Sequence, residues 1–381
     1  MAAPRSQLPA LTPVICGPTA GGKSDLALEL AITLRDTHNI PAEIVTADAF
    51  QVYSGLDIGT AKPTPAERRA IPHHLIDIVP PPGTPALRAG PLGLCSPGSE
   101  SRGTQPFTLD DWLTRANYTI ADLRSRHPPI LPIVVGGTHL YIKALLEGLF
   151  DGPEPDHALR ATLGAMDPAA RRAELERVDP QAAARIHPND TRRTIRALEV
   201  FRLTGTPISA HQKQWDKSES GKSEVGTGKD ERGNDSDTSP LPLPPSHFLL
   251  TILDWQTAAL NARINARVKQ MLVDGLLDEV RALVISNGFT PQSAEALGYK
   301  QLIPIVRGAI EAHAWPPPAP LLDAAIEKIK IDTRRFAKNQ RTWLRRLSAT
   351  PGSLRLSAPP TPESPRESWV PKILAALNLP S

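Results

Sequence analysis

Residues 17–24 read GPTAGGKS, a spacing of glycine, lysine and serine that suits the binding of a phosphate chain. In such a loop the backbone N–H groups and the start of the following helix donate to anionic oxygens, while lysine adds a fixed cation. The candidate phosphate-binding residues are Gly17, Pro18, Thr19, Ala20, Gly21, Gly22, Lys23 and Ser24, with the Ser24 hydroxyl as a candidate ligand of Mg²⁺. Alone, the loop most naturally suggests ATP, but a kinase, a nucleotide hydrolase and a transferase with a diphosphate donor all stay open.

A second group that could do chemistry is Asp48, which ends the apolar run EIVTAD. Motor-type ATPases hold their metal with an acid at the end of another apolar strand, but here the run LPIVVGGT ends in glycine and threonine. Asp48 is therefore expected beside a metal or as a base near the reacting centre, unless it merely caps a turn. A positioned general base typically contributes ~10²–10⁴ in rate.

Alternating strands and helices must position these groups. Apolar runs predict strands at 11–17, 42–48, 73–79 and 129–137. Helical spacing predicts helices at 23–36, 108–126 and 138–149, and a further helical stretch at 257–285. This alternation predicts an α/β fold, a P-loop NTPase-like core with a parallel sheet covered by helices. Ligands of such sheets bind at the carboxyl ends of the strands. The 17–24 loop, Asp48 and the segment 136–138 all fall at such ends.

Changes in composition suggest the domain boundaries. The expected parts are an α/β core at 8–150 with a flexible Pro/Gly/Ser-rich insertion at 80–106, a helical inserted domain at 151–215, a disordered insertion at 216–247, and a return to the core at 248–350. A tail at 351–381 follows, and it closes with a short helix near WVPKILAAL. The segment 216–246 has almost no large apolar side chains before Leu241, so it cannot bury enough surface to offset its ordering entropy.

The segment 321–347 predicts a long amphipathic helix at the end of the core. Its expected apolar stripe consists of Leu322, Ile326, Ile329, Thr333, Phe336, Gln340, Trp343 and Leu347. Its other faces carry Lys328, Lys330, Arg334, Arg335, Lys338, Arg341, Arg345 and Arg346. Such a basic face suits contact with RNA phosphates, and equally suits exposure to water.

The bulk numbers favour a cytoplasmic protein. The 381 residues carry a net charge of +3, and the two cysteines, Cys16 and Cys95, are too few for a disulfide framework or the usual four-ligand zinc site. No apolar run approaches the ~20 residues of a membrane span, and the first residues lack a signal-peptide pattern. We therefore expect no membrane partner.

At TADAFQVYSGLDIGTAKPT the sequence begins to resemble a known family. With GPTAGGKS, IPHHLIDIV, LPIVVGGTHLYIKALLEGL, RIHPNDTRRTIRALEVFRLTG, LGYKQL and RRFAKNQRTWLRR, it resembles tRNA dimethylallyltransferase from about residue 12 to 347. The resemblance implies a phosphate-loop α/β core with an inserted helical tRNA-binding domain. It also implies Mg²⁺-assisted transfer of a dimethylallyl group from dimethylallyl diphosphate to N6 of the adenosine 3′ of the anticodon (position 37), in tRNAs reading UNN codons.

The resemblance also assigns residues. Asp48, Thr19 and Arg263 match catalytic positions, with Asp48 as general base, although Arg267 lies close enough to leave the choice of arginine open. Thr19 to Ser24 match the loop that holds the donor diphosphate. The positions that match tRNA contacts are Asp48, Ala49, Phe50, Gln51, Thr138, Arg160, Arg192, Arg193, Thr194, Ile195 and Arg196.

Three departures from the family pattern stand out. Gly21 replaces the usual serine of the loop, and Ala49 replaces a serine after Asp48. With two cysteines the chain cannot form the zinc finger of many eukaryotic members, so we expect the shorter bacterial type, acting as a monomer.

A P-loop small-molecule kinase and a non-enzymatic RNA-binding module are the alternatives. The first would not need the basic helices, and the second would leave Lys23, Ser24 and Asp48 without a role.

Overall fold

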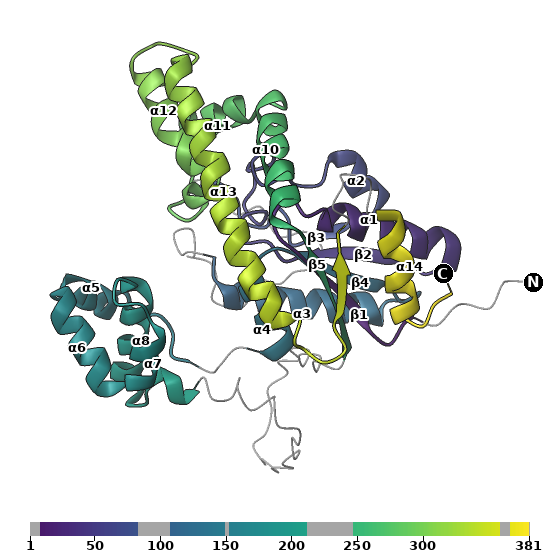
Figure 1. The fold of residues 1–381 in the computed structure, drawn as a ribbon, viewed down its shortest axis with the longest axis horizontal. Coiled ribbons are helices and arrows are strands. Elements are labelled where there is room, and N and C mark those ends of the chain that lie inside the picture. The colour runs from purple at the N-terminus through teal and green to yellow at the C-terminus, as the bar shows by residue number, and fades with distance from the viewer. Residues whose placement is uncertain (1–7, 83–106, 149–151, 212–246, 359–365, 381) are drawn as a thin grey trace, which may run out of the picture. The chain divides into compact units, whose positions relative to one another are not determined.

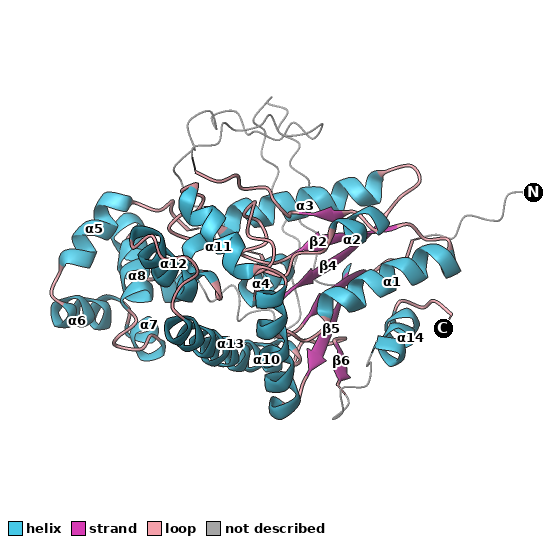
Figure 2. Cartoon of the chain, turned by 90° about the horizontal axis from the view of Figure 1, so that it is seen from above, coloured by secondary structure: helices cyan, strands magenta, loops and turns pink. Residues whose placement is uncertain are grey.

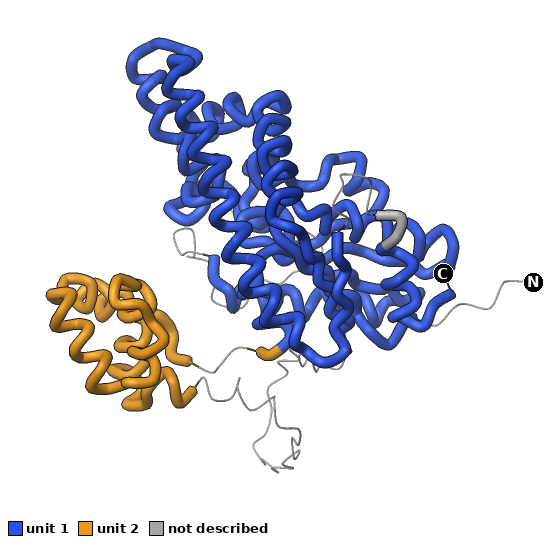
Figure 3. The backbone as a smooth tube through the Cα atoms, in the orientation of Figure 1, with its two compact units in different colours: residues 1–146, 238–381 blue, residues 147–237 orange. Residues whose placement is uncertain are grey.

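The structure is a computed structural model that describes residues 8–82, 107–148, 152–211, 247–358 and 366–380. The expected insertions at 80–106 and 216–247 fall outside these ranges except for residues 80–82 and 247. The chain divides into two compact units (Figure 3), one formed by residues 1–146 with 238–381 and the other by residues 147–237. The helical segment expected at 151–215 lies inside the second unit.

Within the described residues, the first unit contains one parallel sheet of six strands in the order β3-β2-β4-β1-β5-β6 (Figure 1). The strands are β1 (Thr12–Cys16), β2 (Ala42–Thr46), β3 (His73–His74), β4 (Leu131–Gly136), β5 (Phe248–Asp254) and β6 (Leu354–Ser357). β1 lies in the middle, with Val14 opposite Val134 of β4 and Leu250 of β5. The predicted α/β fold with a parallel sheet is confirmed.

Helices cover both faces of this sheet because the strands are apolar on both sides. Alternate residues of β1 face opposite ways: Val14 and Cys16 join one apolar cluster and Ile15 joins the other. Figure 2 shows α3 (Leu109–Ser125) on one side of the strands, and α1 (Lys23–His38) with α14 (Arg366–Ala376) on the other. On the α3 side, the buried Trp112 donates its indole N–H to Thr46 O at 2.9 Å.

The remaining elements of the first unit extend from this core. They are α2 (Pro65–Ala70), α4 (His139–Glu147), α10 (Thr257–Val273), α11 (Leu276–Ile285), the short 3₁₀ helix η3 (Ser293–Glu295), α12 (Tyr299–Glu311) and α13 (Ala319–Leu347). α13 packs against α10 and α12. None of the helices in the described ranges is long and apolar enough to cross a membrane.

The described part of the second unit is helical. Its helices are α5 (His157–Ala165), α6 (Pro168–Val178), α7 (Pro180–Arg185) and α8 (Thr191–Thr204). Each begins after an aspartate whose carboxylate accepts backbone N–H groups of the first turn, and these caps are Asp156, Asp167, Asp179 and Asp190. Leu163, Leu175 and Leu198 are fully buried in its separate apolar core.

Two expected elements are shorter than the sequence suggested. The strand expected at 73–79 ends at His74, because Leu75 and Asp77 have left-handed backbone conformations with φ of 61° and 57° that interrupt an extended strand. The helical stretch 257–285 is two helices, which separate at Gly275 with φ of 99°.

The tail expected at 351–381 contains two ordered elements, and the helix expected near WVPKILAAL is confirmed as α14. β6 pairs with β5 and extends the sheet, and α14 packs against α1 with Trp369 only 1% exposed. The expected apolar stripe of α13 is partly wrong. Phe336 is 38% exposed, and the buried face runs instead through Ala337 and Leu344.

Candidate active site

The loop between β1 and α1 has the backbone geometry expected of a phosphate-binding loop. Gly21 N–H donates to Pro18 O at 3.1 Å, and Ala20 and Gly22 have φ of 59° and 78°. α1 begins at Lys23, and its N-cap residue Gly22 has no side chain that could accept the N–H groups of the first turn. An anion at this helix start is therefore favoured by both the N–H groups and the helix dipole.

Two side chains, one just after β5 and one on α10, hold the loop at Ala20 and Gly21. Trp255, which directly follows β5, donates its indole N–H to Gly21 O at 3.1 Å, and Arg263 Nε donates to Ala20 O at 2.8 Å. The Arg263 guanidinium lies over the Trp255 ring at 4.7 Å, and the Trp369 ring meets Trp255 edge-on at 6.3 Å. Arg263 is thereby fixed beside the loop, with a terminal nitrogen 3.6 Å from where a Cβ on Gly22 would lie.

Lys23 lies between this loop and the end of β4. Its Cε and Nζ are 3.3 Å from the position that a Cβ on Gly137 would take, so Gly137 leaves room for the amine. Burial, together with the charge of Arg267, lowers the pKa of Lys23 to about 8, although Asp48 acts in the opposite direction. With this pKa the amine still carries its charge at neutral pH, and a bound anion would favour the charged form further.

Arg267 is the second arginine of α10 near the site. Burial lowers the pKa of its guanidinium, against the opposing effect of Asp48. Arg267 therefore interacts with both Lys23 and Asp48, whereas Arg263 contacts the loop itself. The two candidates left open by the sequence thus occupy different places in one site.

Asp48 follows β2 by two residues and is held in a fixed orientation. Its Oδ1 accepts the N–H groups of Phe50 at 2.9 Å and Gln51 at 3.3 Å. Within the described chain, Oδ2 has no hydrogen-bond donor. Thr138 tethers the same turn to the end of β4, because its Oγ1 accepts the N–H of Ala49 at 3.0 Å. Thr138, which the resemblance matched to a tRNA contact, thus orients the turn that carries Asp48.

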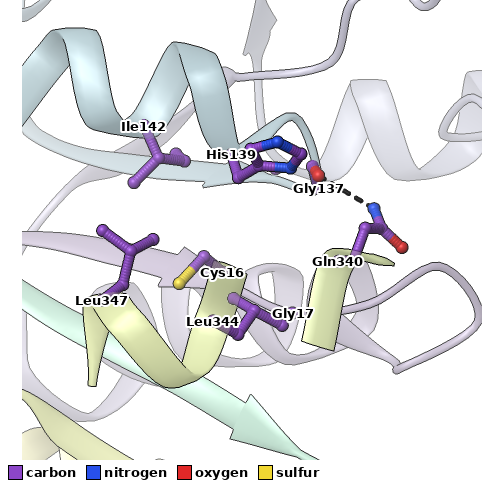
Figure 4. A pocket seen from close by; sticks show the side chains of 9 residues that line it. Cys16, Gly17, Gly137, His139, Ile142, Gln340, Leu344 and Leu347 are labelled. Atoms are coloured by element: carbon purple, nitrogen blue, oxygen red, sulfur yellow. Dashed lines mark hydrogen bonds between the residues drawn. The ribbon is translucent and has the colours of Figure 1, made fainter. Parts of the chain in front are cut away.

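Gln340 of α13 links the two glycine-containing loops of the site. Its Oε1 accepts the N–H of Thr19 at 2.8 Å, and its Nε2 donates to Gly137 O at 2.8 Å (Figure 4). The sequence placed Gln340 on the apolar stripe of α13 without a role. A polar amide at a position that must be buried was the signal that could have pointed to it, since buried amides require partners.

The segment that follows Asp48 is anchored from several directions. Gln51 is 8% exposed, and its amide donates to the carbonyls of Thr60 and Ala61 at 3.1 and 3.2 Å. Glu279 of α11 accepts the N–H groups of residues 57–59. Gln51 was expected to meet tRNA, but its amide is used to hold the 60–61 turn. Asp48, Ala49 and Phe50 remain partly exposed.

In the second unit, a fully buried carboxylate organises two of the expected tRNA-binding arginines. Arg160 makes a two-pronged ion pair with Glu199 at 2.8 and 2.9 Å, and Arg196 binds the same carboxylate at 2.6 Å. Burial alone would raise the pKa of Glu199, but hydrogen bonds from Arg160, Arg196 and the Asp156 N–H lower it overall. Both arginine side chains are about one-third exposed, so Glu199 holds in place guanidinium N–H donors that solvent can still reach.

The five consecutive residues 192–196 do not share one environment, because they lie on the helix α8. Arg192 and Arg193 are exposed, whereas Thr194 is 3% exposed and donates its hydroxyl to Asp190 O. Ile195 packs against the apolar core of the unit. Of this run, the three arginines have exposed or partly exposed side chains, and Thr194 and Ile195 support the helix.

The described residues contain no group of three or more His, Cys, Asp or Glu side chains placed to hold a metal ion. Ser24 is exposed at the start of α1, and no described residue hydrogen-bonds its hydroxyl. Mg²⁺ is commonly bound by one or two protein oxygens together with substrate phosphates and water. Ser24 therefore fits the one protein ligand that such a site needs.

The sequence matches a known protein family and relatives of known name. A family described as IPP transferase matches residues 51–86 and 101–347. A tRNA dimethylallyltransferase of Syntrophobacter fumaroxidans is 39% identical over 341 residues, which cover 87% of this chain and 80% of that protein. A tRNA dimethylallyltransferase of Roseiflexus sp. is 38% identical over 340 residues, covering 87% and 89%.

Solved structures are similar as well. The tRNA isopentenylpyrophosphate transferase of Bacillus halodurans is 28% identical with a TM-score of 0.56, and the match covers 97% of both chains. A eukaryotic dimethylallyltransferase acting on tRNA is 24% identical with a TM-score of 0.65, covering 97% of this chain and 80% of that one, which shows a shared fold. The resemblance inferred from the motifs is confirmed, and the chain belongs to the tRNA dimethylallyltransferase (IPP transferase) family.

Proposed function

We propose that this protein transfers a dimethylallyl group from dimethylallyl diphosphate to N6 of the adenosine 3′ of the anticodon (position 37) in tRNAs that read UNN codons. The observation that carries the proposal is the meeting of a phosphate-binding loop and a carboxylate. The turn that carries Asp48 is bonded to Thr138 through the Ala49 N–H, and Lys23 Cε and Nζ lie 3.3 Å from where a Cβ on the neighbouring Gly137 would be. Lys23 and Asp48 also interact electrostatically with each other and with Arg267. A cradle for a leaving diphosphate and an acceptor for a proton are thus side by side.

The leaving group is stabilised by positive charge. Breaking the bond between the allylic carbon and its oxygen places negative charge on the diphosphate. Lys23, the N–H groups at the uncapped start of α1 and Arg263 supply the neutralising donors. Arg263 is favoured over Arg267 because it is bonded to the loop at Ala20 O, whereas Arg267 is coupled to Asp48. Mg²⁺ bound at Ser24 would supply Lewis-acid charge neutralisation when present.

Asp48 acts as the general base in this proposal. The N6–carbon bond forms as the carbon–oxygen bond to diphosphate breaks, and the N6 proton passes to the carboxylate. Oδ1 is held by two backbone N–H groups, which leaves Oδ2 to accept that proton. An adenosine stacked in its loop cannot reach this carboxylate, so the base must be extruded.

The tRNA is held by exposed basic residues. Arg192 and Arg193 are exposed in the second unit, and Glu199 presets Arg160 and Arg196. On α13, Lys338, Arg345 and Arg346 are among the exposed cations. These groups suit phosphate contacts, whose affinity falls with salt. All of them come from one chain, so we propose an active monomer, working in the cytoplasm where its tRNA substrates are used.

The test is a transfer assay. The protein is incubated with Mg²⁺, dimethylallyl diphosphate labelled in its prenyl group and unmodified tRNA reading a UNN codon. We expect label at adenosine 37 and release of diphosphate. A matched tRNA with guanosine at position 37 is the control and stays unlabelled. ATP turnover with a small-molecule acceptor and no label in tRNA would instead support the kinase alternative and refute the proposal.

A further inference from the structure

The side chain of Gln340 is buried at a point where three distant parts of the chain meet. It is 3% exposed on α13 and 321 positions away from Thr19 in sequence. Its acceptor oxygen receives the Thr19 N–H of the β1–α1 loop, and its amide nitrogen donates to Gly137 O after β4 (Figure 4). One carboxamide therefore ties both glycine-containing loops of the site to α13.

Among side chains of this length, an amide satisfies both bonds at neutral pH. The backbone N–H can only donate and the carbonyl can only accept, so the bridging group must offer one acceptor and one donor. A carboxylate has two acceptors and would repel Gly137 O. A thioether such as methionine fills similar space and satisfies neither partner strongly.

The same amide also lies close to Lys23, beside Gly137. A Cβ on Gly137 would lie 2.9 Å from Gln340 Nε2 and 3.3 Å from both Cε and Nζ of Lys23. The Gln340–Gly137 bond thus fixes the backbone against which the lysine amine lies. The bond from Thr19 also directs a backbone N–H of the 17–24 loop to α13 and so ties the turn at residues 18–21 to that helix.

We propose that Gln340 is a positioning residue for the diphosphate site, acting through the 17–24 loop and Lys23. It holds the 17–24 loop and the Gly136–Thr138 segment in fixed positions relative to each other. The N–H groups and the lysine that bind phosphate are therefore in place before dimethylallyl diphosphate binds. This inference rests on the proposed function for the identity of the donor. Its main readout is the binding of Mg²⁺–pyrophosphate, which requires neither tRNA nor prenyl transfer.

The first variant is Gln340→Met in the full chain. Losing both bonds leaves a part-buried N–H and C=O without partners, and we expect the Kd for Mg²⁺–pyrophosphate, measured by calorimetry, to rise about 10- to 100-fold. KM for dimethylallyl diphosphate rises in parallel, while kcat at saturating donor and the Kd for tRNA stay within about threefold.

Two controls separate positioning from stability. Asn339→Ala changes the exposed neighbour of Gln340 on α13 and leaves the pyrophosphate Kd unchanged. Ile329→Ala opens a cavity at a buried position of the same helix, so it lowers the melting temperature without weakening pyrophosphate binding. If Ile329→Ala weakened pyrophosphate binding as much as Gln340→Met, the effect would be general destabilisation and the positioning role would be refuted.

Gln340→Glu gives a signature that a merely structural role does not produce. A neutral carboxylic acid can accept from Thr19 N–H and donate to Gly137 O, whereas the ionised form cannot. The ratio of variant to wild-type Kd for Mg²⁺–pyrophosphate is therefore expected to fall towards one as the pH is lowered from 8 to 5. A ratio that does not change with pH, or an unchanged Kd in Gln340→Met, overturns the inference. If pyrophosphate binding depended on Gln340 but the protein transferred no prenyl group to tRNA, the proposed function would be refuted and the positioning role of Gln340 would stand.

Discussion

Raising the pH above 8 is expected to weaken capture of the diphosphate donor, because Lys23 loses its proton in that range. Burial and the charge of Arg267 lower the pKa of the Lys23 amine to about 8. The cationic form therefore predominates below pH 8 and is progressively lost above it. Since kcat/KM reports the ionisation of the free enzyme, kcat/KM for the donor carries this pKa.

The size of the effect follows from the titration. With a pKa of about 8, the protonated fraction of Lys23 falls from about 0.9 at pH 7 to about 0.09 at pH 9, and kcat/KM for the donor falls about tenfold. With the ordinary pKa of 10.5, about 0.97 of the amine would still be charged at pH 9, and kcat/KM would hardly change.

The assay measures initial rates of transfer at saturating tRNA and limiting donor between pH 7 and 9.5. The donor itself does not titrate strongly there, since phosphate groups lose their last proton near about pH 6. In Arg267→Gln the pKa of Lys23 rises, and the falling limb moves to higher pH. A kcat/KM for the donor that is flat from pH 7 to 9, or a limb that moves to lower pH in Arg267→Gln, would refute the reasoning.

Three further changes test other parts of the site. Asp48→Asn keeps an oxygen for the two backbone N–H groups and removes the base, so the rate of single-turnover transfer falls about 10²- to 10⁴-fold. The Kd for tRNA, measured by filter binding, stays near normal. Intact turnover would contradict the role of Asp48 as general base. Gly21→Ser places a Cβ 2.9 Å from Pro18 O and 3.3 Å from Trp255 Nε1, so the loop must shift and KM for the donor is expected to rise about fivefold. An unchanged KM would show that the loop accommodates the side chain without cost. Glu199→Gln loosens the preset arginines and raises the Kd for tRNA about tenfold, with the Kd for Mg²⁺–pyrophosphate as the unaffected control.

The parts of the site that the sequence predicted well are those whose partners lie close together in the chain. A glycine-rich turn between a strand and a helix depends on a few consecutive residues, and the 17–24 loop forms as expected. The turn at Asp48 is equally local, because its carboxylate binds N–H groups two and three residues later. The parallel sheet followed from alternation of strands and helices, which needs no knowledge of individual contacts.

The parts that escaped prediction depend on contacts between distant residues. Gln340 is separated from Thr19 by more than 300 positions, and helical periodicity alone predicted only that Gln340 lies on the apolar stripe of α13. The segment beyond residue 350 is rich in proline, yet Trp369 finds a buried place against Trp255 that composition does not reveal. Arginines such as Arg160 are attractive as RNA contacts in sequence, but their shared partner Glu199 becomes apparent only once the helices pack.

The order of strands in the sheet also affects how the chain is synthesised. β1 ends at Cys16, and its neighbour β4 is complete at Gly136, but its other neighbour β5 begins only at Phe248. About 110 residues separate these two neighbours, and at about 5–20 residues per second the ribosome needs roughly 5–20 s to make them. During that time β1 is an unpaired apolar edge of a nascent four-stranded sheet, open to association with other chains. The nascent protein is therefore most exposed to aggregation while its second unit is being made, and its active site is complete only after α13 has left the ribosome.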